Sequence, residues 1–134
     1  MVSCAHFESE VTRRAEVLIV DDNPGVTRAL ARLLEQHGYR TAVCHTGTEA
    51  LAYAARNQPA AAVVDIHLPD ICGLNLSKQL RTRFGAEACP IIVLSGDTSM
   101  ENLKRLPQAG ANYFLSKPFK SEHLVERLKE LAVA

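Results

Sequence analysis

The chain has 134 residues, of which 15 are lysine or arginine and 15 are aspartate or glutamate. This length fits one domain with enough buried core to need neither disulfides nor a structural metal. The balanced charge argues against direct nucleic-acid binding through bulk electrostatics, and the apolar stretches are too short for membrane insertion. The four cysteines are widely spaced without a C-x-x-C pair, which is typical of reduced thiols in a cytoplasmic protein.

The chain is predicted to begin with a flexible tail over residues 1–14, which are polar and without clear period. The domain itself is expected over 15–134, with no internal linker at which a second domain could begin. Its first buried strand should cover 16–20 and end at two adjacent acids, Asp21 and Asp22.

A helix is expected directly after these acids, ending near His37. Asn23 suits its N-cap, Pro24 its first turn, and Gly38 the position where it stops. Its buried face is expected to be an apolar stripe at helical spacing, formed by Val26, Ala29, Leu30, Leu33 and Leu34.

The second strand, expected over 39–44, is less hydrophobic and is therefore assigned to an edge of the sheet. Thr46 and Glu49 have the spacing of a capping box, in which the Thr46 hydroxyl accepts from the amide three residues on and Glu49 reaches back. A second helix is predicted over about 47–56.

The third strand is an apolar run over 60–64 that stops at Asp65. Such a run is typical of a strand buried on both faces of a parallel sheet, so Asp65 should lie at the carboxyl end, where these sheets bind ligands. A third helix is predicted over about 73–84. Its apolar side chains recur every four residues: Leu76, Leu80 and Phe84.

The fourth strand is expected over 90–94 and ends at Ser95. The helix expected next, over 98–109, should be short or bent, because Pro107 removes a helix hydrogen bond. A fifth strand over 112–116 is followed by Lys117.

Ser121 is expected to cap a last helix. Its buried stripe is expected to consist of Leu124, Val125, Leu128 and Leu131. The alternation of five strands with five helices predicts an α/β fold, a doubly wound parallel sheet with helices on both faces.

Polar side chains follow four of the five apolar strands: Asp21 and Asp22, Asp65, Ser95 and Lys117. Because the strands are parallel, these side chains should meet at one edge of the sheet. One such residue is often a structural cap, whereas four sets at one edge indicate a functional site.

Crowded carboxylates repel one another, and two unit charges ~4 Å apart near a protein surface cost on the order of 4 kcal/mol. A divalent cation relieves this repulsion, and hard oxygen ligands favour Mg²⁺ completed by waters. A carboxylate beside Mg²⁺, a lysine and a serine hydroxyl is suited to phosphoryl transfer.

These motifs resemble those of the receiver domains of bacterial two-component response regulators. The resemblance covers about residues 15 to 134. It rests on Val-Asp-Asp (20–22), Val-Asp-Ile-His-Leu-Pro-Asp (64–70), Leu-Ser-Gly (94–96) and Phe-Leu-Ser-Lys-Pro-Phe (114–119). It implies a flavodoxin-like sheet of strand order 2-1-3-4-5. It also implies a signal-transduction module of a phosphorelay that is not an enzyme beyond its own phosphorylation and dephosphorylation.

By this resemblance, Asp65 takes a phosphoryl group from the phosphohistidine of a partner histidine kinase or phosphotransfer protein. Asp22 looks like a direct Mg²⁺ ligand, and Asp21 like one that acts mainly through water. Asp65 itself and the backbone carbonyl of His67 would complete the protein's share of the metal shell, so the imidazole need not ligate.

The resemblance also implies a switch. Ser95 looks like the hydroxyl that turns inward to a phosphoryl oxygen, and Lys117 like its counter-charge. Phe114 occupies the rotameric switch position, although on sequence alone it could equally be plain core packing. The Lys117–Pro118 peptide is predicted to be cis, as is common in the family.

The signal would leave through the face built from the helix at 98–109, the fifth strand and the last helix. The partner there would be a downstream effector, an output domain or a second copy in a homodimer. Two residues depart from the family pattern. Cys72 stands where an acid is frequent, which should alter the turn into the third helix, and Pro107 should give the signalling face a distinct shape.

Three alternatives stay open. A haloacid-dehalogenase-like phosphatase also uses a strand-end Asp with Mg²⁺, but its D-x-D pattern would place a general acid where this chain has His67. A flavodoxin-like flavin binder needs a phosphate loop where Asp21 and Asp22 would repel phosphate. The third alternative is an interaction module that keeps the fold without being phosphorylated.

Two further side chains should flank the mouth of the pocket, His67 two residues after Asp65 and Asp97 two residues after Ser95. Paired across the mouth, they would shield a phosphoryl group from water and affect its lifetime. As two solvated polar residues, they would have no such effect.

Overall fold

A computed structural model describes residues 15–85, 88–96, 104–105 and 108–131. Its core is a sheet of five parallel strands in the order β2-β1-β3-β4-β5, as predicted. The strands are β1 (Glu16–Val20), β2 (Arg40–Cys44), β3 (Ala61–Asp65), β4 (Ile91–Ser95) and β5 (Tyr113–Ser116). The predicted edge position of the second strand is confirmed, because β2 has β1 as its one neighbour.

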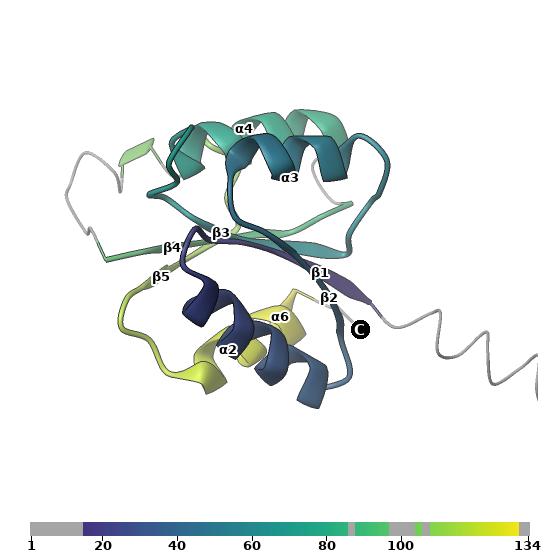
Figure 1. Ribbon diagram of the computed structural model, residues 1–134, viewed down its shortest axis with the longest axis vertical. Coiled ribbons are helices and arrows are strands. Elements are labelled where there is room, and N and C mark those ends of the chain that lie inside the picture. Colours follow the sequence, from purple (N-terminus) through teal and green to yellow (C-terminus); the bar gives the residue numbers. More distant parts are fainter. Residues whose placement is uncertain (1–14, 86–87, 97–103, 106–107, 132–134) are drawn as a thin grey trace, which may run out of the picture.

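Four helices lie within the described ranges, where five were expected: α2 (Pro24–Gln36), α3 (Gly47–Ala54), α4 (Gly73–Phe84) and α6 (Ser121–Glu130). Helices α3 and α4 cover one face of the sheet, and α2 and α6 cover the other (Figure 1). Most of the helix expected over 98–109, including Pro107, lies outside the described residues, as does the tail predicted at 1–14.

Both faces of the central strands are buried. In β3, Ala62 and Val64 pack with the side chains of α3 and α4, while Ala61 and Val63 pack with those of α2 and α6. This two-sided burial explains why the strand is a continuous apolar run instead of an alternation. The apolar core therefore holds the strand that ends at Asp65 from both sides.

Helix α2 begins as predicted, because the Asn23 side chain accepts hydrogen bonds from Gly25 N at 2.9 Å and Val26 N at 3.3 Å. Its buried face differs from the predicted stripe, since Ala29 is exposed and Thr27 is buried. The Thr27 hydroxyl donates to Pro24 O at 3.1 Å, so burying it leaves no unsatisfied donor.

Of two predicted helix caps, one is confirmed and one needs correction. In α3, Thr46 caps Glu49 N at 3.0 Å, and the Glu49 carboxylate reaches back to accept from His45 N, one residue before the N-cap. In α6, Ser121 is the first helical residue, and the N-cap is Lys120, whose side chain makes no capping hydrogen bond.

None of the helices in the described ranges has both the length and the apolar character that crossing a bilayer requires. Cys44, Cys72 and Cys89 are free thiols. Burial raises the pKa of both Cys44 and Cys89 to about 11, so these thiols stay protonated near neutral pH.

Candidate functional site

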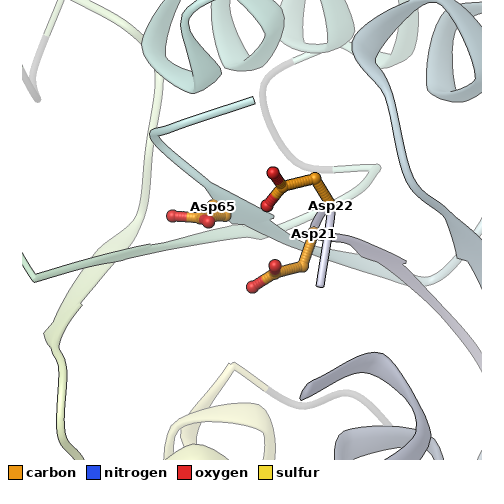
Figure 2. A group of neighbouring side chains, drawn as sticks. All are labelled: Asp21, Asp22 and Asp65. Atoms are coloured by element: carbon orange, nitrogen blue, oxygen red, sulfur yellow. The ribbon is translucent and has the colours of Figure 1, made fainter. Parts of the chain in front are cut away.

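Three carboxylates gather at the carboxyl edge of the sheet (Figure 2). Asp21 and Asp22 directly follow β1, and Asp65 is the last residue of the neighbouring strand β3. Each offers one oxygen, and these oxygens lie within 4.8 Å of one another. Asp21 and Asp65 are buried whereas Asp22 is exposed, so the cluster opens to solvent on the side of Asp22.

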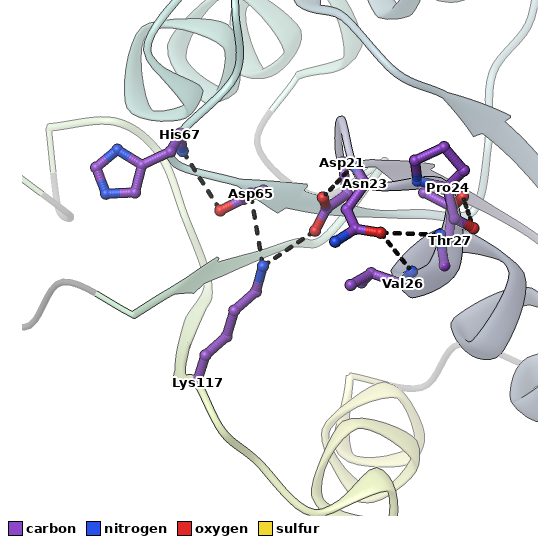
Figure 3. A network of polar contacts seen from close by, with 9 residues as sticks. Asp21, Asn23, Pro24, Val26, Thr27, Asp65, His67 and Lys117 are labelled. Carbon is purple, nitrogen blue, oxygen red and sulfur yellow. Dashed lines mark hydrogen bonds and ion pairs between the residues drawn. The ribbon is translucent and has the colours of Figure 1, made fainter.

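Lys117 connects two of these acids. Its Nζ lies 3.1 Å from Asp21 Oδ2 and 3.5 Å from Asp65 Oδ2 (Figure 3). The residue directly follows β5, and its backbone N–H donates to Ser95 O at 2.8 Å. The Lys117–Pro118 peptide is cis, which confirms the prediction.

Burial and charge act in opposite directions on this group of side chains. Burial raises the pKa of Asp65, and nearby Asp21 adds to this, while the ammonium of Lys117 works against it. Burial disfavours the charged form of Lys117, but its hydrogen bond to Asp21 and its attraction to Asp65 outweigh that effect and raise its pKa.

The donor set of this edge fits a hard divalent cation. Three carboxylates and one ammonium leave the cluster net negative when all are ionised. Carboxylate oxygens are the ligands that Mg²⁺ prefers, and no thiolate or imidazole belongs to the cluster among the described residues.

The two oxygens of Asp65 have different environments. The backbone N–H of His67 donates to Oδ1 at 3.3 Å, and Oδ2 is the oxygen that approaches Lys117. The His67 side chain is exposed, and its ring points away from Asp65 (Figure 3). His67 therefore contacts the Asp65 side chain through its backbone.

Ser95 and Phe114 lie on the two strands beyond β3. Ser95 is the last residue of β4 and is fully buried, one position past the Leu94 that pairs with Asp65. Phe114 pairs with Val93 and packs half-buried against the cluster under α3 and α4. Ser95 is thus at the edge that carries the acids, while Phe114 is set back in the sheet.

The family model of the response regulator receiver domain matches residues 17–129. The chain belongs to this family. The sensory/regulatory protein RpfC of Xanthomonas campestris pv. campestris is 35% identical over 124 residues, which are 91% of this chain and 17% of RpfC. The response regulator MprA of Mycobacterium ulcerans is 36% identical over 115 residues, which are 86% of this chain and 49% of MprA.

Solved structures agree with this assignment. A CheY-like response regulator receiver domain protein from Methanospirillum hungatei superposes with a TM-score of 0.84 at 30% identity, over 89% of this chain and 94% of that one. This receiver domain spans about half the length of MprA and a smaller part of RpfC.

Two predictions concern the edges of the site. Asp97, expected to face His67 across the mouth, lies outside the described residues of this receiver domain. Cys72 is the N-cap of α4, and its side chain makes no capping hydrogen bond. An acid at this position could cap the helix, which the thiol does not do, and the expected change of the turn stays a prediction.

Two residues near the site had no role assigned from the sequence beyond a helix cap or a place in a motif. The backbone N–H of Asn23 donates to Asp21 Oδ1 at 2.9 Å and so holds one of the acids in place. Asp70, at the end of the motif that begins with Val64, binds the first turn of α3. In the sequence, Asp70 is an acid in a turn, and this pattern does not reveal a partner more than 20 residues away.

Proposed function

We propose that this receiver domain accepts a phosphoryl group on Asp65 from the phosphohistidine of a histidine kinase or phosphotransfer protein. The observation that carries the proposal is the contact of Lys117 with both Asp21 and Asp65 at an edge that also holds Asp22. A buried carboxylate next to an ammonium group and two further acids has the parts that phosphoryl transfer requires.

In the proposed reaction, one carboxylate oxygen of Asp65 attacks phosphorus. The new O–P bond forms as the P–N bond to the donor imidazole breaks, and the electron pair of that bond stays on the imidazole nitrogen. Lys117 balances the charge of the phosphoryl oxygens, and it lies within 3.5 Å of the attacking carboxylate before transfer. His67 N–H, on Oδ1, orients the carboxylate.

Asp21, Asp22, Asp65 and the backbone carbonyl of His67 are the groups proposed to hold Mg²⁺. The ion would supply positive charge that neutralises the acids and the incoming phosphoryl group. Asn23 N–H donates to Asp21 Oδ1 and so orients the buried acid of the pair.

The signal is proposed to pass through Ser95 and Phe114. The Ser95 hydroxyl turns toward a phosphoryl oxygen, and the ring of Phe114 follows into the vacated space, which biases a two-state element toward its active form. Support comes from their positions on adjacent strands, β4 and β5. Partners are proposed to detect this change at the face formed by the segment at 98–109, β5 and α6.

The proposed partner at that face is a downstream effector, an output domain or a second copy in a homodimer. The chain matches 49% of MprA and 17% of RpfC, so these relatives contain further segments to which a receiver could be joined. The free thiols of the described cysteines are compatible with the proposed cytoplasmic location.

The alternative of a haloacid-dehalogenase-like phosphatase gains no support at the position that would carry its general acid. His67 stands there, is exposed, and turns its ring away from Asp65 (Figure 3). This orientation favours the phosphoacceptor proposal.

Intact mass spectrometry tests the proposal directly. After incubation with Mg²⁺ and acetyl phosphate, the parent protein should gain the mass of one phosphoryl group, and Asp65→Asn should gain none. Glu126→Gln, which removes an exposed acid on α6, is the control and should be modified like the parent. A parent protein that gains no mass would favour the interaction module that keeps the fold without phosphorylation.

A further inference from the structure

The loop between β3 and α4, residues 66–72, leaves the site at Asp65 and closes tightly on itself. Gly73 N donates to Ile66 O at 2.6 Å, and His67 and Cys72 form an isolated antiparallel bridge. A Cβ on Gly73 would lie 2.1 Å from Asp65 O, so only glycine fits where α4 starts against the strand end. The base of the loop is therefore fixed by the backbone.

Asp70, at the tip of the loop, binds the loop to the start of α3. Its carboxylate accepts from Gly47 N at 2.8 Å, from Thr48 N at 2.8 Å and from the Thr48 hydroxyl at 2.6 Å. All three donors belong to the first turn of α3. Hydrogen bonds to an ionised carboxylate are shorter and stronger than neutral ones, and these distances fall in that range.

The contact is also a close packing of the loop on the helix. A Cβ on Gly47 would lie 1.9 Å from Ile71 Cγ2, so the side chain next to Asp70 sits directly on the α3 backbone. The hydrogen bond from the Thr48 hydroxyl, together with those from the Gly47 and Thr48 amides, lowers the pKa of Asp70 to about 2. The carboxylate thus stays charged at any pH where the domain would signal.

A plain helix cap explains only part of this arrangement. Thr46 already caps Glu49 N from within the local sequence, as most N-caps do. Asp70, 22 and 23 residues further along the chain, supplies the acceptors for the amides of Thr48 and Gly47, the two residues before Glu49. It stands five residues after Asp65, on the loop whose His67 N–H holds Asp65 Oδ1.

We infer that Asp70 is a positioning residue for the Asp65 site, which clamps the 66–72 loop onto α3 and so fixes the backbone of His67. This inference rests on the proposed function, because the fixed groups are the His67 N–H on Asp65 and the His67 carbonyl on the proposed metal. The His67 N to Oδ1 distance, 3.3 Å, is at the long end for a hydrogen bond, so a small shift of the loop breaks it.

Loss of the clamp should weaken Mg²⁺ binding more than it weakens the chemistry. Partners that orient a metal ligand typically contribute ~10–100-fold to affinity, and Asp70 acts through the backbone, so about tenfold weaker binding is expected in Asp70→Ala. Asp65 and Lys117 keep their contact in this variant. Saturating Mg²⁺ should therefore restore most of the phosphorylation rate, short of the part that the His67 N–H contributes by orienting Asp65.

Two measurements on four proteins test the inference. Calorimetric titration gives the Kd for Mg²⁺, and amide hydrogen exchange of the metal-free protein reports on the 66–72 loop. The proteins are the parent, Asp70→Ala, Thr48→Val and the control Glu126→Gln. The control removes an exposed acid from α6, which covers the face of the sheet opposite to α3 (Figure 1). Thr48→Val deletes one of the three donors and should give an intermediate effect in both measurements.

The inference is supported when Asp70→Ala raises both the Kd and the exchange of the loop while Glu126→Gln changes neither. An unchanged Kd, or unchanged loop exchange, in Asp70→Ala overturns it. Should Asp70→Ala fail to fold, Thr48→Val decides by the same two criteria. If the parent binds Mg²⁺ but gains no phosphoryl group, the proposed function is wrong, and the clamp can still be measured. If the parent binds no Mg²⁺, both the proposed function and the inference are wrong.

Discussion

The ammonium group of Lys117 lies 3.1 Å from a carboxylate oxygen of Asp21, a residue 96 positions earlier in the chain. The Asp21 side chain is 2% exposed and that of Lys117 is 29% exposed. Such a pair falls between exposed ion pairs, worth ~0–1 kcal/mol, and buried ones, whose disruption costs ~3–5 kcal/mol. The pair therefore contributes to folding as well as to the site.

Lys117→Ala should lower the free energy of unfolding by about 2 kcal/mol without Mg²⁺, because the buried carboxylate of Asp21 loses its positive partner. Added Mg²⁺ should stabilise this variant more than the parent, since a cation that binds only the folded state then relieves more repulsion. Urea unfolding with and without Mg²⁺ measures both effects. Lys78→Ala, an exposed change on α4, is the control, and equal Mg²⁺ responses in Lys117→Ala and the parent would contradict the argument.

Ser77 of α4 has a fully buried side chain whose hydroxyl has no hydrogen-bond partner in the described part of the chain. An unsatisfied buried hydroxyl costs ~1–3 kcal/mol, and alanine removes it while leaving little empty space. Ser77→Ala should therefore raise the free energy of unfolding by about 1 kcal/mol. Ser116→Ala, at an exposed position, should change it little, and a Ser77→Ala protein less stable than the parent would show that the hydroxyl has a partner.

Asp70 should make the stability of the domain depend on pH in the acid range. Its folded pKa of about 2 lies below the ~3.9 of an unfolded aspartate, so its stabilising effect is present above ~3.9 and is lost as pH falls toward 2. The difference in thermal midpoint between the parent and Asp70→Asn should thus shrink over that range. A difference that stays constant from neutral pH to the acid limit would exclude this linkage, and Glu126→Gln serves as the reference for a solvated acid.

Much of the fold could be predicted because its signals are local. The apolar run over 61–64 stops at Asp65, and both of its faces are buried, so the sequence pattern alone identified a central strand. The capping by Asn23 depends on residues two and three positions away and was predicted for the same reason. Asp21, Asp22, Ser95 and Lys117 meet at one edge because parallel strands share their carboxyl ends.

Predictions were wrong where tertiary packing decided the outcome. Helical spacing assigned Ala29 to the buried stripe, but Ala29 is exposed and Thr27 is buried, with its hydroxyl satisfied within the helix. Asp70 was missed because its partners Gly47 and Thr48 are remote in sequence. Contacts of this kind depend on how a loop meets the start of a helix remote in sequence, which no periodicity encodes.

The switch prediction concerns Ser95 and the strand next to it. Ser95→Ala should leave phosphorylation of Asp65 largely intact, because the hydroxyl acts after transfer. It should reduce the phosphorylation-dependent amide shifts of β5, including Phe114, that the parent shows by NMR. Ser77→Ala is the matched control, since it removes a buried hydroxyl away from the edge. Full-sized shifts in Ser95→Ala would refute this route.

The lifetime of the phosphoryl group should depend on His67 and Asp97. His67 follows Asp65 by two residues, and its side chain is exposed with the ring turned away from Asp65 (Figure 3). Hydrolysis needs a water in line with the breaking bond, and groups at the mouth can orient or block it without touching the Asp65 carboxylate.

If His67 pairs with Asp97, then His67→Ala and Asp97→Ala should both shorten the lifetime of the phosphoryl group. Decay of phospho-Asp65, followed by intact mass in the three proteins, measures this, and superimposable curves would mean that both side chains are merely solvated.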